Sequence, residues 1–248
     1  MKKIFAANWK LNKTPNESRE FFKKLDGKEL AGFFENRELI FFPQNFSFEA
    51  VATTIASSQN LKTVGFGPQN VFSQSSGAFT GENSAVVASG LGAKFILLGH
   101  SERRQFFAET NSGLSEKLAF VQQNHLTAVF CVGETLAERD SGKTGFVLDQ
   151  QLREGLKNAI KANRVVIAYE PVWAIGTGQV ATSDQVRETH KMVFNLLSTL
   201  GFKDFQILYG GSVKPDNAKE LLAIPHVDGF LVGGASLEVD SFLKICQS

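Results

Sequence analysis

The sequence is poor in cysteine and carries almost no excess of charge. Cys131 and Cys246 are the two cysteines among 248 residues, too few for a disulfide framework, so a reducing compartment is the simpler setting. Lysine and arginine number 26 against 25 aspartates and glutamates, for a formal net charge of +1. A nucleic-acid or membrane-surface partner usually requires a basic excess. We therefore expect neither kind of partner.

Long apolar runs are missing as well. No stretch approaches the roughly 18 apolar residues of a membrane-spanning helix. The first residues resemble a signal peptide only briefly, because Asn8 and Lys10 interrupt the run before an apolar segment of roughly 7–15 residues is complete. We expect a cytoplasmic protein with no membrane attachment.

No linker, charge block or low-complexity tract divides the chain. Instead, short apolar runs recur, mostly continuous rather than alternating, as in strands buried on both faces of a parallel sheet. The runs lie at residues 4–9, 39–42, 64–66, 95–98, 128–132, 165–169, 205–209 and 229–232. Their spacing is that of a βα unit of roughly 30 residues.

Helix-start signals fill the intervals between these runs. The segments at 14–17 and 182–185 are capping boxes, Gly201 should end the second of these helices, and 214–217 begins another. Eight unbroken units predict one α/β domain over 1–248, a (β/α)₈ barrel with eight parallel strands and surrounding helices. A doubly wound open sheet is the alternative, although it rarely needs eight near-equal units.

Polar residues follow several of the predicted strands, and barrel active sites form at the carboxyl ends of strands. The first strand leads into Asn8 and Lys10, the fourth into His100 and the sixth into Glu170. Burial at the end of an apolar strand should raise the pKa of Glu170 towards that of a useful base, although a structural ion pair is the alternative. Lys10 could neutralise a substrate phosphate or a developing oxyanion.

His100 precedes a short predicted helix. The positive end of a helix disfavours an imidazolium, so we expect a neutral ring that donates a hydrogen bond, with a satisfied core histidine as the alternative. No pair of histidines or carboxylates has the spacing of metal ligands, which argues against a zinc or two-metal site.

Two glycine-rich turns follow the last two strands, at 210–212 and 233–234. Glycine lets backbone N–H groups approach an anion, and the loops after strands seven and eight are the usual phosphate site of a barrel. Simple tight turns are the alternative. Residues 171–178 form an apolar loop after Glu170, between Pro171 and a Gly-Thr-Gly segment, which predicts a lid that excludes water. A permanently packed surface loop is the alternative there.

Five motifs in order resemble the triosephosphate isomerase family over nearly the whole chain. They are NWK at 8–10, LGHSERR at 98–104, AYEPVWAIGTG at 168–178, YGGS at 209–212 and LVGGA at 231–235. The longest of them is highly specific to that family. The resemblance implies an aldose–ketose isomerase of glycolysis and gluconeogenesis. Such an enzyme interconverts dihydroxyacetone phosphate and D-glyceraldehyde 3-phosphate through an enediolate, with no cofactor or metal.

The resemblance also assigns residue roles. Glu170 would move a proton between neighbouring carbons, while neutral His100 would polarise the carbonyl and shuttle protons between the two oxygens. Further implied roles are charge stabilisation by Lys10 and Asn8, support of Lys10 by Glu102, phosphate binding by backbone N–H groups of Gly176, Ser212, Gly233 and Gly234, and a lid of Pro171, Val172, Trp173, Ala174, Ile175, Gly176 and Thr177.

The family is typically a homodimer, and the segment 69–82 resembles its interdigitating third loop, which would carry Thr80 to the partner's active site. A floppy surface loop is the alternative. Gln179, residues 42–46 and Asn83 depart from the family's usual pattern and leave lid kinetics and interface details open. The 23 phenylalanines, beside two tyrosines, have no functional explanation at this level.

Two other functions remain open on the sequence. A Schiff-base aldolase on a phosphosugar barrel would need a buried lysine on a late strand, whereas the sixth strand ends in Glu170 and Lys10 is the only lysine expected at the rim. A phosphosugar-binding protein on an inactive barrel would not need all four expected catalytic side chains.

Overall fold

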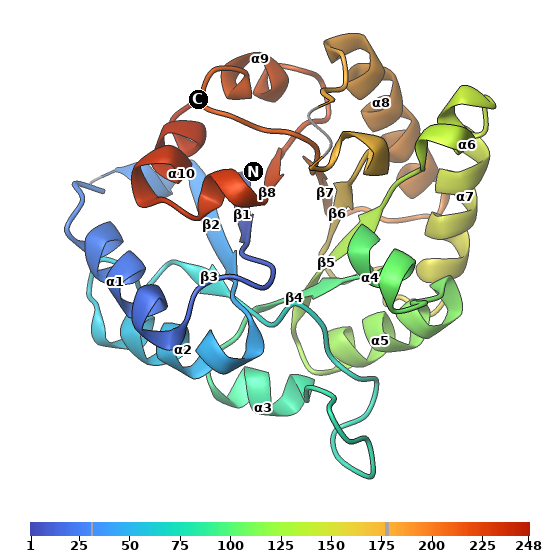
Figure 1. Ribbon diagram of the computed structural model, residues 1–248. Helices are drawn as coiled ribbons and strands as arrows, with labels where there is room; N and C mark the ends of the chain where they lie inside the picture. The colour runs from blue at the N-terminus through green and yellow to red at the C-terminus, as the bar shows by residue number, and fades with distance from the viewer. Residues whose placement is uncertain (31, 177–178) are drawn as a thin grey trace.

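Eight parallel strands form one curved sheet in the order β3-β2-β1-β8-β7-β6-β5-β4. The structure is a computed structural model that describes residues 1–30, 32–176 and 179–248. Figure 1 looks along the axis of the resulting barrel, with the helices arranged outside the ring of strands. The strands are β1 Lys3–Asn8, β2 Arg37–Phe42, β3 Gly65–Phe66, β4 Phe95–Leu98, β5 Thr127–Val132, β6 Val165–Tyr169, β7 Phe205–Tyr209 and β8 Gly229–Val232.

The barrel closes between β3 and β4. The N–H of Lys94 donates to the carbonyl of Phe66, and the N–H of Leu97 donates to the carbonyl of Pro68, both at 3.1 Å. Gly67 lies in this seam, where a Cβ atom would come within 1.6 Å of the Phe95 carbonyl oxygen. Only glycine permits this approach of two backbones. The predicted (β/α)₈ barrel is therefore confirmed, and the open sheet is excluded.

Helices connect successive strands on the outside of the barrel. They are α1 Pro15–Asp26, α2 Phe48–Ser57, α3 Ala85–Gly90, α4 Ser101–Phe106, α5 Asn111–Gln123, α6 Leu136–Asp140, α7 Thr144–Gly155, α8 Ser183–Thr199, α9 Ala218–Leu222 and α10 Val239–Cys246, with short 3₁₀ turns η1 Phe33–Glu35, η2 Asn45–Ser47, η3 Val172–Ala174 and η4 Gly234–Ser236. Across the described residues, none of these helices has the length and apolar character needed to cross a membrane.

The predicted elements lie where the sequence placed them, with small shifts at their ends. The capping boxes at Thr14 and Thr182 are both formed, and α8 ends just before Gly201, whose φ of 87° suits glycine. The helix expected from 214–217 begins later, at Ala218. There the Asn217 side chain accepts a hydrogen bond from the backbone N–H of Lys214, which closes a turn before the helix.

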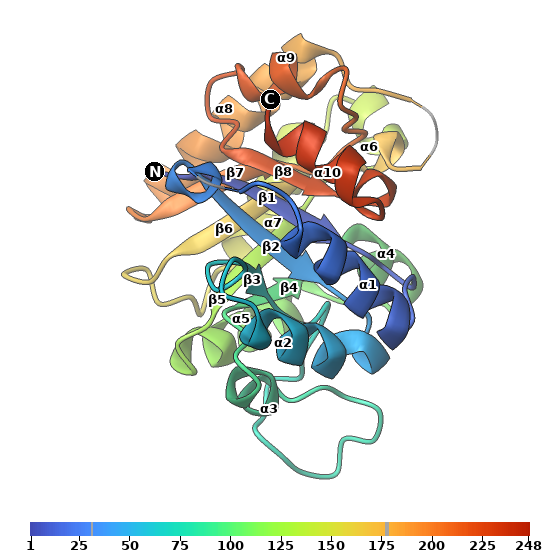
Figure 2. The same cartoon turned by 90° about the vertical axis from the view of Figure 1, so that its left-hand side faces the viewer.

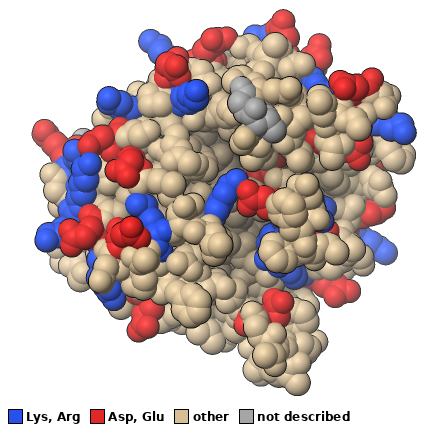
Figure 3. Space-filling model, in the orientation of Figure 1, with Lys and Arg blue, Asp and Glu red and all other residues tan. Residues whose placement is uncertain are grey.

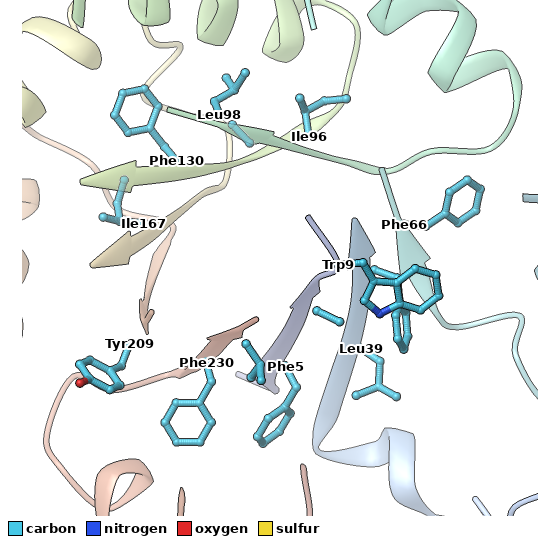
Figure 4. Close-up of a cluster of buried hydrophobic side chains, with 14 of the residues drawn as sticks. Phe5, Trp9, Leu39, Phe66, Ile96, Leu98, Phe130, Ile167, Tyr209 and Phe230 are labelled. Atoms are coloured by element: carbon cyan, nitrogen blue, oxygen red, sulfur yellow. The ribbon is translucent and has the colours of Figure 1, made fainter. Parts of the chain in front are cut away.

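Alternate residues of each strand enter two separate apolar layers. One layer fills the barrel interior and includes Ile4, Ile40 and Val129. The other lies between the barrel and the helices, and in Figure 4 its labelled members, such as Phe5 and Phe130, point away from the barrel axis. Both faces of every strand are thus buried, which explains the continuously apolar runs in the sequence.

The strand ends therefore have fixed positions around the rim of the barrel. Figure 2, a quarter turn from Figure 1, shows the carboxyl ends of β1 and β2 pointing towards the viewer of Figure 1. The loop before α3 projects well beyond the helical layer in both views. The first feature positions the candidate active site, and the second presents Thr80 to solvent.

Candidate active site

One pocket of about 250 Å³ opens at the carboxyl ends of the strands. Figure 3 shows the same face, hollowed near its centre, with positive and negative side chains next to one another there. The predicted site residues that line the pocket are Asn8, Lys10, His100, Glu170, Ala174, Ile175, Gly176, Ser212, Gly233 and Gly234. Elements far apart in sequence thus bring a carboxylate, an imidazole, an ammonium group and two glycine turns together. A pocket of this size suits a small polar molecule.

Glu170 follows β6 and is 2% exposed. One carboxylate oxygen accepts a hydrogen bond from Nε2 of His100 at 3.0 Å, and the other accepts from the backbone N–H of Ser101 at 2.9 Å. Gly210 leaves room for this side chain, since a Cβ at that position would lie 2.9 Å from Cγ of Glu170. Both oxygens of the Glu170 carboxylate therefore have a hydrogen-bond partner in the segment that follows β4.

These partners decide the pKa of Glu170. Burial acts to raise it, as the sequence predicted, but the charge and hydrogen bond of His100 act in the other direction. With the N–H of Ser101 and the charge of Lys10, they hold the pKa of Glu170 below its usual value. The prediction of a raised pKa is thus wrong for this arrangement. Burial can be read from a strand pattern, whereas partners on other strands cannot.

His100 caps the start of α4. Its Nε2 donates to Glu170, and its Nδ1 lies 3.3 Å from the backbone nitrogen of Glu102 and 3.5 Å from a carboxylate oxygen of the same residue. Burial acts to lower the pKa of His100, but the carboxylates of Glu170 and Glu102 outweigh it and raise the pKa above its usual value. The pKa of His100 is thus shifted in the direction opposite to the one that the sequence predicted for a neutral ring. Removing the contact with Glu170 would lower it, with burial still opposed by Glu102.

Lys10 lies beyond the end of β1 with a positive φ of 52°, an unusual conformation for a residue with a side chain. The Asn8 side chain accepts a hydrogen bond from the Lys10 N–H at 3.0 Å. Nζ of Lys10 contacts a carboxylate oxygen of Glu102 at 2.5 Å. The Lys10 chain also passes the last glycine turn, with Cε 3.6 Å from where a Gly233 Cβ would lie. The ammonium group of Lys10 is thus held at the pocket.

The turns after β7 and β8 form the opposite wall of the pocket. The Ser212 hydroxyl donates to the carbonyl of Ala174 at 2.9 Å, which ties this turn to the predicted lid. Lys214 also lines the pocket and is exposed. The expectation that Lys10 is the only rim lysine is therefore wrong, because Lys214 lies on a loop after the strand end and carries no strand pattern of its own.

Comparison with known proteins agrees with this geometry. A sequence model of the family described as triosephosphate isomerase matches residues 3–248. A relative named triosephosphate isomerase from Bdellovibrio bacteriovorus is 56% identical over 247 residues, with 100% of both chains covered. The chain belongs to the triosephosphate isomerase family. Relatives of the same name from Dictyoglomus turgidum and Chlorobium chlorochromatii are 41% and 43% identical, covering 100% of this chain and 99% and 98% of theirs.

The segment that resembles the lid of triosephosphate isomerases begins with the short turn η3. Ile175 and Gly176 line the pocket, whereas the side chain of Trp173 points the other way and donates to Glu134 at 3.1 Å. Arg139 lies 5.2 Å from the centre of the Trp173 ring. Thr177, the last residue of the predicted lid, lies outside the described residues. The predicted lid is therefore anchored at its first turn, next to Glu170.

The sequence did not lead us to predict two residues that hold other site residues in place. Glu134, fully buried after β5, also accepts a hydrogen bond from the hydroxyl of Tyr169 at 3.1 Å, so one carboxylate holds both the predicted lid and the end of β6, next to Glu170. Gln69, after β3, donates to the backbone carbonyl of Lys10 at 2.8 Å. Both follow predicted strands, and the strand-end rule that found His100 would have found them too.

Among the described residues, the predicted lid residues Pro171, Val172 and Trp173 lie outside the pocket wall, as do two other predicted residues. Glu102 reaches the site through its ion pair with Lys10, and Thr80 lies on the projecting loop. Within 1–30, 32–176 and 179–248, no group of three or more His, Cys, Asp or Glu side chains is placed to hold a metal ion. Cys131 and Cys246 are both buried and unpaired.

The coupling of Glu170 and His100 predicts a measurable pKa change. Burial lowers the pKa of His100, and the charge of Glu170 raises it. Glu170→Gln removes that charge, so the pKa of His100 should fall relative to the wild type. Titration of the His100 ring by NMR in the ligand-free protein measures it. Glu138→Gln is the matched control, since Glu138 bonds to Thr135 at the start of α6. An unchanged His100 pKa in Glu170→Gln would show that the carboxylate does not raise it.

Proposed function

We propose that Glu170 and His100 are the catalytic pair of this triosephosphate isomerase. The enzyme interconverts dihydroxyacetone phosphate and D-glyceraldehyde 3-phosphate, the reaction of its family in glycolysis and gluconeogenesis. One observation carries the assignment of roles. A buried carboxylate and the imidazole of His100 share a 3.0 Å hydrogen bond at the wall of the pocket.

The base is Glu170. Its carboxylate removes a proton from the hydroxymethyl carbon of dihydroxyacetone phosphate, and the electron pair moves towards the carbonyl oxygen to give an enediolate. The Nε2–H of His100 donates to that oxygen as negative charge develops. His100 then moves a proton from the neighbouring hydroxyl oxygen to the former carbonyl oxygen, and return of the proton from Glu170 to the neighbouring carbon gives glyceraldehyde 3-phosphate. Protons move and no oxidant or reductant is consumed, so the scheme requires no cofactor and no metal.

Substrate must replace the bond between the two catalytic groups. The single proton on Nε2 of His100 is donated to Glu170 in the ligand-free site, so it cannot at the same time polarise a carbonyl. When the carboxylate leaves His100 and the Ser101 N–H for the substrate carbon, it loses the contacts that lower its pKa. The movement thus converts a stabilised carboxylate into a stronger base, while burial favours the neutral form of His100.

Lys10 and Asn8 supply electrostatic complementarity to an anionic substrate. The ammonium of Lys10 is balanced by Glu102 in the ligand-free site. A triose phosphate brings further negative charge, which the cation stabilises both in the ground state and as the enediolate forms. Asn8 lines the pocket and holds the Lys10 backbone through its side-chain oxygen.

The phosphate would lie against the glycine turns. Backbone N–H groups of Gly176, Ser212, Gly233 and Gly234 are the proposed donors, since all four residues line the pocket. Closure of the segment 171–177 over this end would exclude water, and loop gating of this kind is well known from the triosephosphate isomerase family itself. Exclusion of water protects an enediolate that can otherwise lose its phosphate.

Shortening the base tests the assignment. Glu170→Asp withdraws the carboxylate by about one methylene and should lower turnover of glyceraldehyde 3-phosphate on the order of 10²-fold or more, measured with a coupled dehydrogenase. Glu138→Asp is the control and should retain wild-type turnover, because Glu138 is half-buried, bonds to Thr135 at the start of α6 and does not line the substrate pocket. A folded Glu170→Asp enzyme with wild-type turnover would remove Glu170 from the role of base.

The surface beside the site supports a homodimer, which we propose for this enzyme. A second pocket of about 340 Å³ is lined by Lys10, Glu102 and several apolar side chains. Its rim exposes large apolar residues, with Leu11 90%, Phe106 67% and Phe107 67% exposed. Apolar rims of this kind mark interaction sites. The projecting loop carries Thr80 and is the proposed occupant, supplied by a second copy of the chain.

The loop is already shaped for that role. The rings of Phe72 and Phe79 pack against each other with their planes tilted by 36° and their centroids 4.3 Å apart, and the N–H of Phe72 donates to the carbonyl of Asn83 at 2.9 Å. Preorganisation of this kind lowers the ordering cost of association. A loop held together by its own side chains contrasts with the floppy loop that was the alternative.

Sedimentation tests the dimer. The wild type should sediment as a dimer at micromolar concentration, whereas Thr80→Arg should dissociate it, because the new charge would enter a pocket that already holds Lys10 and Arg103. Phe146→Arg is the control, since Phe146 is 70% exposed on α7 and lies outside this pocket. A wild type that is monomeric and fully active would overturn the dimer.

The cytoplasm is the proposed location. Cys131 and Cys246 are free thiols buried in the barrel and under α10, a state that a reducing compartment maintains.

A further inference from the structure

The backbone of Lys10 is held by side chains rather than by secondary structure. Its φ of 52° is disfavoured for any residue with a Cβ atom, so neighbouring groups must maintain it. On its N–H side, the Asn8 side chain accepts a hydrogen bond at 3.0 Å. On its carbonyl side, Nε2 of Gln69 donates at 2.8 Å. Both polar groups of this strained peptide thus depend on two amide side chains.

Gln69 makes a second bond with the same nitrogen. Its other N–H donates to the carbonyl of Phe42 at 2.9 Å, at the end of β2. The Phe42 carbonyl also accepts from the N–H of Trp9, at 3.2 Å, so Gln69 joins the loop after β1 to the neighbouring strand end. Both donors of the amide are used, and no other side chain type of that length offers two donors without a charge in this geometry.

The packing beneath the loop is rigid and aromatic. Trp9, directly before Lys10, is fully buried and meets Phe21 and Phe41 edge-on, with centroids 4.9 and 5.6 Å apart. Part of the unexplained phenylalanine content therefore supports the segment that carries Lys10. With Trp9 fixed on one side, the orientation of Lys10 depends on its carbonyl contact on the other.

We propose that Gln69 is a positioning residue for catalysis, which holds Lys10 in its strained conformation so that the ammonium group meets the anionic substrate. The proposal rests on the function proposed above for Lys10. It also gives the projecting loop a second task, because Gln69 lies at the base of the segment that would enter the partner subunit. Docking of that loop on the partner would stabilise the hydrogen bonds of Gln69 to Lys10 and Phe42 in the loop's own chain.

Lys13, on the same loop as Lys10, provides a matched control. Gln44 donates through Nε2 to the carbonyl of Lys13 at 3.2 Å, and Lys13 also has a positive φ, of 66°. The Lys13 ammonium lies over the ring of Phe21, 5.1 Å from its centre, and does not line the substrate pocket. Ser47 bonds to the same carbonyl and would remain. Gln44 thus donates to the carbonyl of a lysine with a positive φ, as Gln69 does, but that lysine does not line the substrate pocket.

A double-mutant cycle tests the inference. Gln69→Met keeps the length of the side chain and removes both donors, and Gln69→Glu keeps the shape and places oxygens against two carbonyls. Each should lower kcat/KM for glyceraldehyde 3-phosphate about 3- to 10-fold, the effect of roughly one hydrogen bond. In a Lys10→Met background the same changes should cost less than about 2-fold, because the group that they position is gone. Gln44→Met should leave kcat/KM unchanged.

Each variant is first checked for wild-type sedimentation and circular dichroism. An equal loss in both backgrounds would show that Gln69 acts through the general structure and would overturn the proposal, as would wild-type kcat/KM in both Gln69 variants. If Lys10→Met alone retains wild-type kcat/KM, the assigned function of Lys10 fails instead. The two failures are therefore distinguishable.

Discussion

The hydrogen bond between His100 and Glu170 is the interaction on which the site depends. It fixes the carboxylate in a buried position, determines where the imidazole proton lies and shifts the pKa values of both groups. Neither residue could be held so by its own loop, because β4 and β6 are separated in the sheet by β5. The register of the parallel strands brings the two side chains to one level of the rim, and closure of the barrel keeps them there.

Around this pair, the scaffold stabilises conformations that the chain would not adopt alone. Lys10 keeps a left-handed backbone between Asn8 and Gln69. Gly67 allows the β3–β4 seam to close. Glu134 holds the first turn of the proposed lid and the end of β6 with one carboxylate. Each device joins segments from different βα units, so the precision of the site comes from the whole barrel.

The sequence predicted the barrel and most of the pocket because both rest on local patterns. Continuous apolar runs located the strands, and the strand-end rule located His100 and Glu170. The lowered pKa of Glu170 could not be predicted, since it depends on distances between strands that no local pattern contains. Lys214 was missed for a different reason, because it lies beyond a strand end on an irregular loop. The single domain and the roles of the site residues remain predictions.

The central claim is that substrate and the His100–Glu170 bond exclude one another. A crystal structure with glycerol 3-phosphate, a triose phosphate analogue without a carbonyl, measures this directly. The account predicts that Oε1 of Glu170 moves from its 3.0 Å contact with Nε2 of His100 to beyond hydrogen-bond range, about 3.5 Å or more. It also predicts loss of the bond from the Ser101 N–H. An analogue bound in the pocket with both bonds intact would contradict the account.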